Sequence, residues 1–378
     1  MTRAPRQPRL RILADDLTGA LDCAAAFGAG VPVQLGRPAS HATEDIDTVA
    51  TATRDVPVDE LPALLAPSLA WLRGGDVAFK KVDSLLRGNT FDEVDWLARQ
   101  TPPQALAFVP AFPAQHRTTE NGQQWWRQAD GTRAPVPASI REELQARGWR
   151  VDTGATAPQA NGQALAWVPD VHGDADLDRI ARTALQAESP WLWCGSAGLA
   201  HALARQLPAR AAPSASALAS ADTLGGVMLV SASHHEVSRG QWHALRAVHG
   251  PQCHSGEDPR TLETGADRYP TFIDLSASAP LTPAQAARSL KAQTQAIAAH
   301  APRPRALVVV GGDTLLSLCH ALGATALRSE RALDRPGWGC ARLVGGRWDG
   351  LVCHTRSGAF GGPRDLLEVI DKVQARQA

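Results

Sequence analysis

Short apolar runs alternate with stretches of helical spacing along most of this chain, and this alternation restricts the fold more than any other feature. Strands that alternate with helices form parallel β-sheets covered by helices. In the first half, strands are expected at residues 9–14, 31–35, 77–82, 105–109, 164–168 and 191–194, and helices at 17–27, 61–72, 91–99, 139–147 and 177–187. The sequence therefore predicts an α/β protein in which most strands are parallel.

The alternation is interrupted around residues 207–224, where the sequence is rich in Ala, Ser and Pro, as in a linker. Beyond it, strands are expected at 227–230, 271–275, 306–310 and 351–354, and helices at 238–248, 283–300 (capped by Thr282), 314–322 and 364–374. A chain of 378 residues is long enough for two domains. We predict a domain over residues 1–210, a linker over 211–224 and a domain over 225–378. Each domain is expected to be a mostly parallel sheet flanked by helices, with the active site in the cleft between the domains.

The composition argues against several classes of protein. Lys plus Arg and Asp plus Glu are 38 each, which argues against a nucleic-acid binder that relies on a strong overall basic field. No apolar run approaches the roughly 18 residues of a membrane-spanning helix, and the basic N-terminus lacks the apolar segment of a signal peptide. Six scattered Cys without a CxxC pair fit the reduced thiols of a cytoplasmic protein. We therefore expect small-molecule partners and a cytoplasmic location, and a homo-oligomer is compatible with the sequence.

Two adjacent carboxylates, Asp15 and Asp16, follow the first expected strand, and Thr18 and Gly19 come next. Ligands of open parallel sheets bind at the carboxyl ends of the strands. Paired carboxylates at such a place can orient a hydroxyl, accept its proton or hold a metal ion. The alternative is a helix cap, because Asp and Thr are favoured there, but a cap needs only one of the two carboxylates.

A second polar cluster lies at the end of the expected strand at 77–82. Its members able to bind a ligand are Lys81, Asp83, Ser84, Arg87 and Asn89. The chain has only four Lys, so the adjacent pair at positions 80 and 81 is unusual. Arg offers a bidentate fork, Lys a point charge, and Asp and Asn polar partners, so the set could hold a carboxylate and several hydroxyls. Arg54, which follows another short strand, could join this cluster. The alternative is a solvated charged turn.

Two glycine loops follow expected strands of the second half. Gly311, Gly312, Asp313 and Thr314 come after residues 306–310, and the loop 358–362, with Gly358 and Gly361, comes after 351–354. Glycine lets the backbone approach a phosphate, and the helix N-terminus that follows favours negative charge. Asp313 could accept a proton or position Mg²⁺, and Thr314 could bond a phosphate oxygen. Because GxxxxGK[ST] is absent, this is not a Walker A loop, and we predict a nucleotide site of another kind.

Other motifs are less informative. The stretch 194–199, CGSAGL, could bind an anion or serve close packing, and the proline-rich loop 109–119, which ends in Arg117 and two Thr, is of a type that is commonly structural. A metal site is one interpretation of the adjacent residues His234, His235 and Glu236, but no further ligand stands at a suitable spacing. We expect a polar loop that lines the nucleotide pocket there, and no protein-bound metal site.

Six stretches taken together resemble the four-carbon acid sugar kinases, which use ATP to phosphorylate tetronates such as threonate, erythronate or their oxo relatives. They occur in the family's order from residue 12 to near 370: ADDLTGALD, KKVDSLLRGN, FVPAFPAQHRTT, CGSAGLA, VVGGDTLLSLCHALG and RLVGGRWDGLVCHTRSGAFG. The resemblance implies a sugar-acid-binding domain followed by a nucleotide-binding domain, with phosphorylation of the terminal hydroxyl by ATP and Mg²⁺. On the matching positions it implies contacts of the sugar acid with Asp15, Asp16, Arg54, Lys81, Val82, Asp83 and Ser84, and of ATP with Ser233, Gly311, Gly312, Asp313, Thr314 and Gly358.

The chain departs from the family's pattern at several loops. His116 stands where the family usually has Gly, ASHHEVS around Ser233 replaces GSxSPVT, and RSGAFG, which begins at Arg356, replaces KAGGFG. The GNxGAE-like stretch reads GNTFDE from Gly88. Two alternatives therefore stay open: a kinase for another polyhydroxy acid, and a non-catalytic sensor of a sugar acid or nucleotide.

The residues also predict a mechanism. Lys81 and Arg87 would hold the carboxylate, while Asp16 or Asp313 would orient the attacking hydroxyl and take its proton. We prefer Asp313 as the catalytic base, beside the phosphate glycines, and Asp16 as the catalytic residue that orients the substrate.

Overall fold

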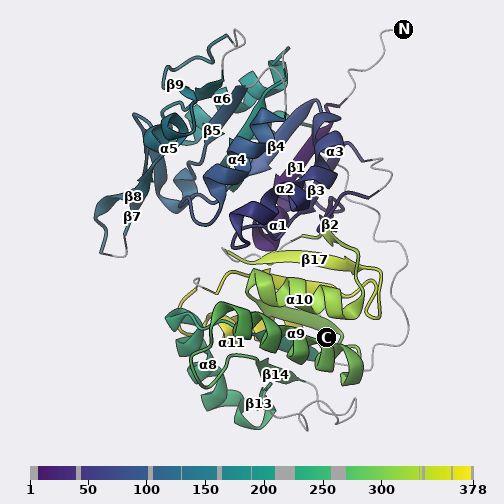
Figure 1. Ribbon diagram of the computed structural model, residues 1–378. Coiled ribbons are helices and arrows are strands. Elements are labelled where there is room, and N and C mark those ends of the chain that lie inside the picture. Colours follow the sequence, from purple (N-terminus) through teal and green to yellow (C-terminus); the bar gives the residue numbers. More distant parts are fainter. Residues whose placement is uncertain are drawn as a thin grey trace. The chain divides into compact units, whose positions relative to one another are not determined.

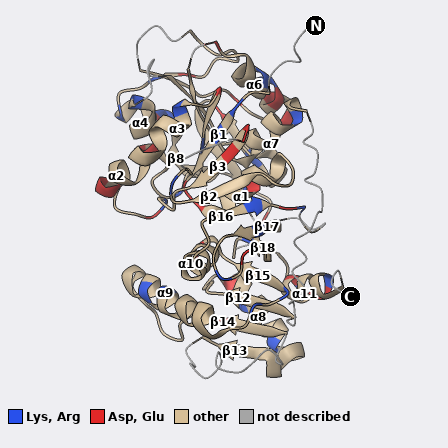
Figure 2. Ribbon diagram, turned by 90° about the vertical axis from the view of Figure 1, so that its right-hand side faces the viewer, with Lys and Arg blue, Asp and Glu red and all other residues tan. Residues whose placement is uncertain are grey.

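The computed structural model describes residues 7–39, 44–100, 105–128, 130–159, 164–188, 190–208, 226–256, 270–331, 333, 337–358 and 361–375. The chain forms two compact units, unit 1 over Met1–Ala211 and unit 2 over Ala212–Ala378 (Figure 1). The linker predicted over 211–224 lies outside the described residues. Basic and acidic residues occur together in both units (Figure 2).

Unit 1 is built on a parallel sheet in the order β2-β3-β1-β4-β11-β5-β10-β9. Its central strands are buried over their whole length, which explains why the sequence shows them as continuous apolar runs. The strands are β1 (Leu10–Ala14), β2 (Pro32–Leu35), β3 (Ile46–Ala50), β4 (Val77–Lys81), β5 (Ala105–Val109), β9 (Arg150–Asp152), β10 (Leu165–Trp167) and β11 (Leu192–Gly195).

Two groups of helices pack on this sheet. In the first group α7 contacts both α1 and α6, and in the second α4 contacts both α2 and α5. The second group shares one hydrophobic core with strands β1, β4 and β5, which includes Leu13, Leu97, Phe108 and Leu144. The helices are α1 (Leu17–Ala26), α2 (Leu61–Leu65), α3 (Leu69–Arg73), α4 (Thr90–Arg99), α5 (Ile140–Ala146), α6 (Asp174–Gln186) and α7 (Ala197–Gln206).

The continuous helix expected over 61–72 is wrong. The chain forms α2, then a 3-10 turn, η2 (Ala66–Ser68), and then α3. Pro67 lies in that turn. Because proline has no N–H and its ring clashes with the preceding helical turn, an α-helix does not continue through it.

Unit 1 also holds an antiparallel sheet that the sequence did not predict, in the order β6-β7-β8. Its strands are β6 (Arg117–Glu120), β7 (Gln123–Arg127) and β8 (Arg133–Ser139), and η3 (Pro113–Gln115) precedes β6. Pro135 and Pro137 lie in β8, which pairs within this sheet only with β7. Strands this polar, with proline at an edge, lack the apolar pattern by which strands are recognised.

Unit 2 has a sheet in the order β13-β14-β12-β15-β18-β17-β16. Its pairings are parallel from β13 to β18, whereas β17 pairs antiparallel with both β18 and β16. The strands are β12 (Val227–Ser231), β13 (Cys253–Ser255), β14 (Thr271–Asp274), β15 (Ala306–Val310), β16 (Ala326–Ser329), β17 (Gly339–Val344) and β18 (Val352–Arg356). The prediction of mostly parallel α/β sheets is confirmed, and the antiparallel end of this sheet adds to it.

Two pairs of helices pack in unit 2: α8 (Glu236–His249) with α11 (Asp365–Ala375), and α9 (Pro283–His300) with α10 (Gly312–Leu322). Thr282 caps α9 in a reciprocal capping box with Gln285, as the sequence led us to expect. Among the described residues, no helix combines the length and the apolarity that a membrane crossing requires.

Candidate functional site

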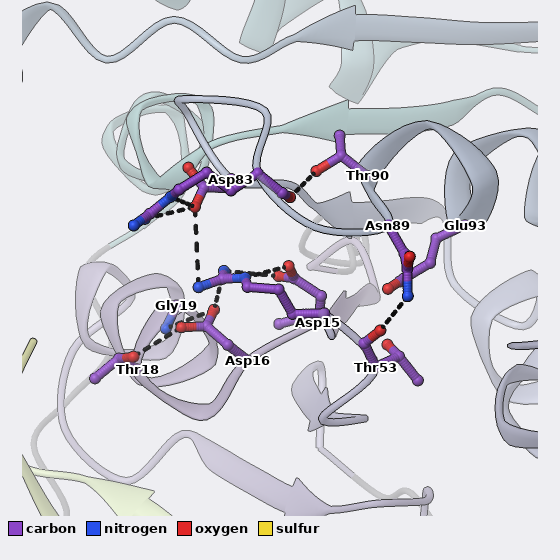
Figure 3. Close-up of polar contacts among 12 residues, drawn as sticks. Asp15, Asp16, Thr18, Gly19, Thr53, Asp83, Asn89, Thr90 and Glu93 are labelled. Atoms are coloured by element: carbon purple, nitrogen blue, oxygen red, sulfur yellow. Dashed lines mark hydrogen bonds and ion pairs between the residues drawn. The ribbon is translucent and has the colours of Figure 1, made fainter. Parts of the chain in front are cut away.

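Three adjacent strands of unit 1 end at the same edge of the sheet. β1 pairs with β3 on one side and with β4 on the other, and Ala14 lies opposite Ala50 and Lys81. The residues that follow these strands therefore come together, although up to about seventy positions separate them in the sequence. Figure 3 shows the result: Asp15, Asp16 and Asp83 gather around one guanidinium group.

That guanidinium group belongs to Arg54. Its Nε donates to Asp15 Oδ2 at 2.8 Å, its Nη2 lies 2.9 Å from Asp16 Oδ1, and its Nη1 lies 3.9 Å from Asp83 Oδ2. Burial alone would lower the pKa of Arg54, but the carboxylates of Asp16 and Asp15 outweigh it and raise the pKa. Arg54 and the three carboxylates thus form an ion-pair network that fixes all four side chains.

The two carboxylates after β1 have different roles. Asp16 caps α1 by accepting from the Gly19 N–H at 3.2 Å, and it also accepts from the Thr18 hydroxyl at 2.7 Å. Asp15 is 3% exposed. Burial would raise the pKa of Asp15, yet the charges of Lys80, Arg54 and Lys81 lower it to about 2. The cap interpretation is therefore correct for Asp16, while Asp15 is a carboxylate that is ionised at neutral pH and holds cations in place.

The adjacent lysines point in opposite directions, because side chains alternate across a strand. The ammonium group of Lys80 forms an ion pair with Glu93 of α4, and both side chains are 1% exposed. Lys81 lies beside α1, where a Cβ added to Gly19 would stand 2.6 Å from its Nζ. Burial would lower the pKa of Lys81, but Asp16 and Asp15 raise it, so the side chain stays protonated. Sequence reasoning missed Glu93, since a helix partner follows only from the packing.

The turn after β4 is organised by Asp83 and Asn89. Asp83 accepts from the Leu85 N–H at 2.7 Å and from Arg87 Nε at 2.6 Å. The Asn89 amide donates to the carbonyl oxygens of Thr53, at 2.9 Å, and Val56, at 2.7 Å. Asn89 thus positions the loop that carries Arg54.

Val82 and Gly88 serve the same turn through packing. The Val82 side chain is buried in the hydrophobic core. Gly88 has a φ of +67°, and a Cβ there would overlap the carbonyl oxygen of Arg54. Only glycine fits this close approach without strain.

Ser84 is contacted from the unpredicted antiparallel sheet. Arg117 Nη1 donates to Ser84 Oγ, and Gln124 Nε2 donates to the Ser84 carbonyl oxygen at 2.9 Å. The proline-rich loop, which looked structural, therefore delivers a cation to the site. Sequence reasoning gave Arg117 little weight and missed Gln124. His116, before it, adopts a left-handed conformation with φ +55° and ψ +37°.

The stretch 194–199 favours the packing interpretation. Ser196 caps α7 by accepting from the Gly198 N–H at 3.1 Å and donates to the Ala111 carbonyl oxygen at 2.6 Å. A Cβ on Gly198 would stand 2.7 Å from that same carbonyl oxygen.

In unit 2, the expected nucleotide residues follow three neighbouring parallel strands, β12, β15 and β18. Gly311, between β15 and α10, has a φ of +104°, and the buried Thr314 lies in the first turn of α10. Ser233 and Gly358 come so close that a Cβ on Gly358 would overlap Ser233 Oγ. Such a glycine turn before a helix N-terminus, whose first N–H groups have no partner in the helix, suits a phosphate group.

Arg356, the last residue of β18, anchors the loop that carries Gly358 and Gly361. This guanidinium group is buried, lies 3.3 Å from Asp365 Oδ2 through its Nε, and stacks 5.1 Å from the centre of the Trp338 ring. Gln241, which Arg356 also contacts, donates to the Gly362 carbonyl oxygen at 2.8 Å. The family's usual lysine is thus replaced by an arginine with its own partners. Gly361 has a φ of +88°, and a Cβ there would stand 2.5 Å from Asp365 Oδ2.

Asp313 is exposed in the first turn of α10, at the edge of a hollow of about 380 Å³ between α9 and α10. Within the described residues, no group of three or more His, Cys, Asp and Glu could hold a metal ion. Mg²⁺ in phosphoryl transfer is usually held by one or two carboxylates and the substrate phosphates, so Asp313 beside the glycine turn fits that requirement. His235, in the polar loop after β12, caps α8.

A family model described as a sugar-binding N-terminal domain matches residues 10–142. A D-threonate kinase of Cupriavidus necator is 31% identical, over 85% of this chain and 88% of the relative. A D-threonate kinase of Bordetella bronchiseptica is 28% identical over 98% of both chains.

Solved structures share the fold. A Salmonella typhimurium LT2 protein superimposes with a TM-score of 0.71 at 18% identity, over 97% of this chain and all of that one. A Haemophilus influenzae protein gives a TM-score of 0.67 at 18% identity, over 96% of this chain and 99% of that one.

Proposed function

Because this chain belongs to the four-carbon acid sugar kinase family and is a phosphotransferase with an alcohol group as acceptor, we propose that it transfers the γ-phosphoryl group of ATP to the terminal hydroxyl of a tetronate. D-threonate is the first candidate for the acceptor. The observation that carries this choice is the similarity to the D-threonate kinase of Cupriavidus necator over most of both chains.

Unit 1 would bind the sugar acid. The proposed contacts are Asp15, Asp16, Arg54, Lys81, Val82 through its backbone, Asp83, Ser84 and Arg87, with Asn89 holding the loop of Arg54. The ion-pair network around Arg54 supports this proposal, because dipoles and charges that are fixed before the substrate arrives need no reorganisation during the reaction.

Unit 2 would bind ATP. The backbone N–H group of Gly312 and the hydroxyl of Thr314 would face the phosphates, and Gly311, whose own N–H donates to the Arg356 carbonyl oxygen, would form the turn that lets the phosphates approach. Ser233 and Gly358 would form the opposite wall. Mg²⁺, bound with ATP, would neutralise charge on the phosphates.

Asp313 is our proposed base. Asp16 already accepts from Gly19 and Thr18 and contacts Arg54, so its carboxylate is better suited to orienting the substrate than to taking a proton. Asp313→Asn is expected to lower kcat by about 10²-fold or more while both KM values change little. Asp371→Asn, an exposed position on α11, is the matched control. Near-normal turnover of the Asp313 variant would remove Asp313 from this role.

The test of the function is coupled ADP release with Mg²⁺ and ATP against D- and L-threonate, D- and L-erythronate and their oxo forms. Turnover with one tetronate well above the background without substrate is the expected result. If no acid of the panel gives ADP release, but ATP and an acid each raise the melting temperature, the protein is instead a sensor or a kinase for another polyhydroxy acid. If there is no ADP release and ATP does not change the melting temperature, the proposed nucleotide site is wrong.

A further inference from the structure

We propose that Arg117 binds the carboxylate of the sugar acid and so decides that the substrate is an acid and not a neutral sugar alcohol. This inference rests on the proposed function of unit 1 and assigns one end of the substrate to one side chain. Arg117 lies at the start of β6, within the antiparallel sheet.

The position of Arg117 is fixed by its backbone and by one side-chain contact. Its N–H donates to the Phe112 carbonyl oxygen at 3.1 Å, and its own carbonyl oxygen accepts from the Phe112 N–H at 2.8 Å. Nη1 donates to Ser84 Oγ, which belongs to the turn after β4. A half-buried guanidinium group therefore stands at the edge of the Asp83 and Ser84 turn, held there before any ligand binds.

Two other cations of this site have carboxylate partners within ion-pair distance: Arg54 contacts three carboxylates, and Arg87 lies 2.6 Å from Asp83 Oδ2. Lys81 forms no such pair among the described residues, but the charges of Asp16 and Asp15 compensate its burial and raise its pKa. In the part of the chain that the structure describes, no carboxylate lies within ion-pair distance of Arg117. Asp83, the acid that acts on it electrostatically, already accepts from Leu85 and Arg87.

The environment leaves the charge of Arg117 poorly compensated. Burial lowers the pKa of Arg117, Asp83 raises it and Arg87 lowers it again, with a lowered pKa as the net result. A guanidinium group in this situation gains when an anion arrives, and its planar fork matches a carboxylate with two parallel hydrogen bonds.

The charges of the whole site support the same conclusion. Lys80 and Glu93 cancel each other within the core. Of the remaining ionised groups at the site, four are positive (Arg54, Lys81, Arg87 and Arg117) and three are negative (Asp15, Asp16 and Asp83), which leaves one positive charge. A tetronate carries one negative charge, so its carboxylate brings the site to neutrality, whereas a tetritol of the same length does not.

The experiment measures binding and turnover of D-threonate and of threitol, the neutral analogue, by the full-length protein and its Arg117→Gln and Arg117→Lys variants. Arg127→Gln is the matched control, because Arg127 is exposed on the neighbouring strand β7. Arg117→Gln is expected to raise the Kd and KM for D-threonate about 10- to 100-fold, the range for a lost charge-assisted hydrogen bond to a buried partner. The KM for ATP and the weak binding of threitol should stay unchanged, and Arg117→Lys should lose less than Arg117→Gln.

The outcomes separate this inference from the proposed function. If the unaltered protein binds D-threonate and Arg117→Gln binds it within about twofold, the carboxylate lies elsewhere and the inference is overturned alone. If the unaltered protein binds no tetronate, the proposed function fails and the inference falls with it. Should Arg117→Gln not fold, Arg117→Lys decides, because an unchanged Kd and unchanged discrimination against threitol would overturn the bidentate contact.

Discussion

The buried pair of Lys80 and Glu93 allows a prediction of stability that the structure makes quantitative. Lys80→Met removes the cation and leaves the Glu93 carboxylate without a partner, although the Glu93 side chain is only 1% exposed. Breaking a buried ion pair from one side costs about 3–5 kcal/mol, because the remaining charge is neither hydrated nor paired. We expect a loss of that size in the free energy of unfolding.

The double variant Lys80→Met with Glu93→Leu is the decisive comparison. Replacement of both members of a buried pair by apolar side chains is often neutral or stabilising, by up to about 4 kcal/mol. The double variant should therefore be clearly more stable than Lys80→Met. Arg205→Met, which removes an exposed ion pair with Asp178, serves as the control and should cost no more than about 1 kcal/mol.

Urea unfolding followed by tryptophan fluorescence measures these differences, since most of the eleven Trp lie in unit 1. Of the positive charges that lower the pKa of Asp15, Lys80 contributes most, so its loss should also raise the pKa of Asp15 in the site. Two results would refute the reasoning. One is a Lys80→Met variant that loses less than about 1 kcal/mol instead of the expected ~3–5 kcal/mol. The other is a double variant that is no more stable than the single one.

Three further predictions follow from single positions. The pKa of Asp15, about 2, lies below its ordinary value in an unfolded chain, so ionised Asp15 contributes about 2 kcal/mol of stability that is present above about pH 4 and is lost as the pH falls toward 2. The unfolding free energies of the unaltered protein and Asp15→Asn should converge over that window, and parallel pH profiles would contradict the assignment. Gly358→Ala should raise the KM for ATP at least tenfold with little effect on the KM for the acid, because the new Cβ overlaps Ser233 Oγ. Gly362→Ala, with open space around its Cβ, should change neither KM, and equal changes of the KM for ATP in the two variants would contradict the role of the loop. His116→Gly should raise the unfolding free energy by up to about 1 kcal/mol, since relief of the left-handed strain exceeds the entropy cost of glycine, and a measured loss of stability would show the opposite balance.

The parallel core of each unit could be predicted from the sequence because its strands are buried on both faces. The expected strands at 105–109 and 306–310 coincide with β5 and β15, and the expected helix at 283–300 coincides with α9, including its cap. Burial on both faces requires a continuous apolar run, and a capping box is a local signal. The antiparallel sheet of β6, β7 and β8 gave no such signal, because its strands are mostly polar and carry two prolines.

The candidate site was predictable as a collection of residues but not as a network. Asp15, Arg54 and Asp83 each follow a strand, and parallel strands bring their ends together. Which carboxylate pairs with which cation depends on packing: the sequence suggested Arg87 as the clamp for a substrate carboxylate, and the structure pairs it with Asp83. The contact between Arg117 and Ser84 depends on the sheet that the sequence did not predict.

The departures from the family's pattern also find a physical explanation in places. Arg356 stands where the family usually has lysine, and the buried Asp365, together with Trp338, holds its guanidinium group. An arginine there keeps the positive charge and adds a planar surface for the ring. The loop that begins at Ser357 is therefore anchored in a way that the sequence motif alone could not reveal.

The central claim, phosphoryl transfer to the terminal hydroxyl of a four-carbon acid sugar, is tested most directly by proton-coupled ³¹P NMR of the product formed from ATP, Mg²⁺ and D-threonate. We predict a new phosphate monoester whose phosphorus signal is a triplet, because two protons on the terminal carbon couple to it. A doublet would place the phosphate on a secondary hydroxyl and contradict the proposed orientation of the substrate. The absence of any new monoester with every tetronate of the panel would contradict the proposed function itself.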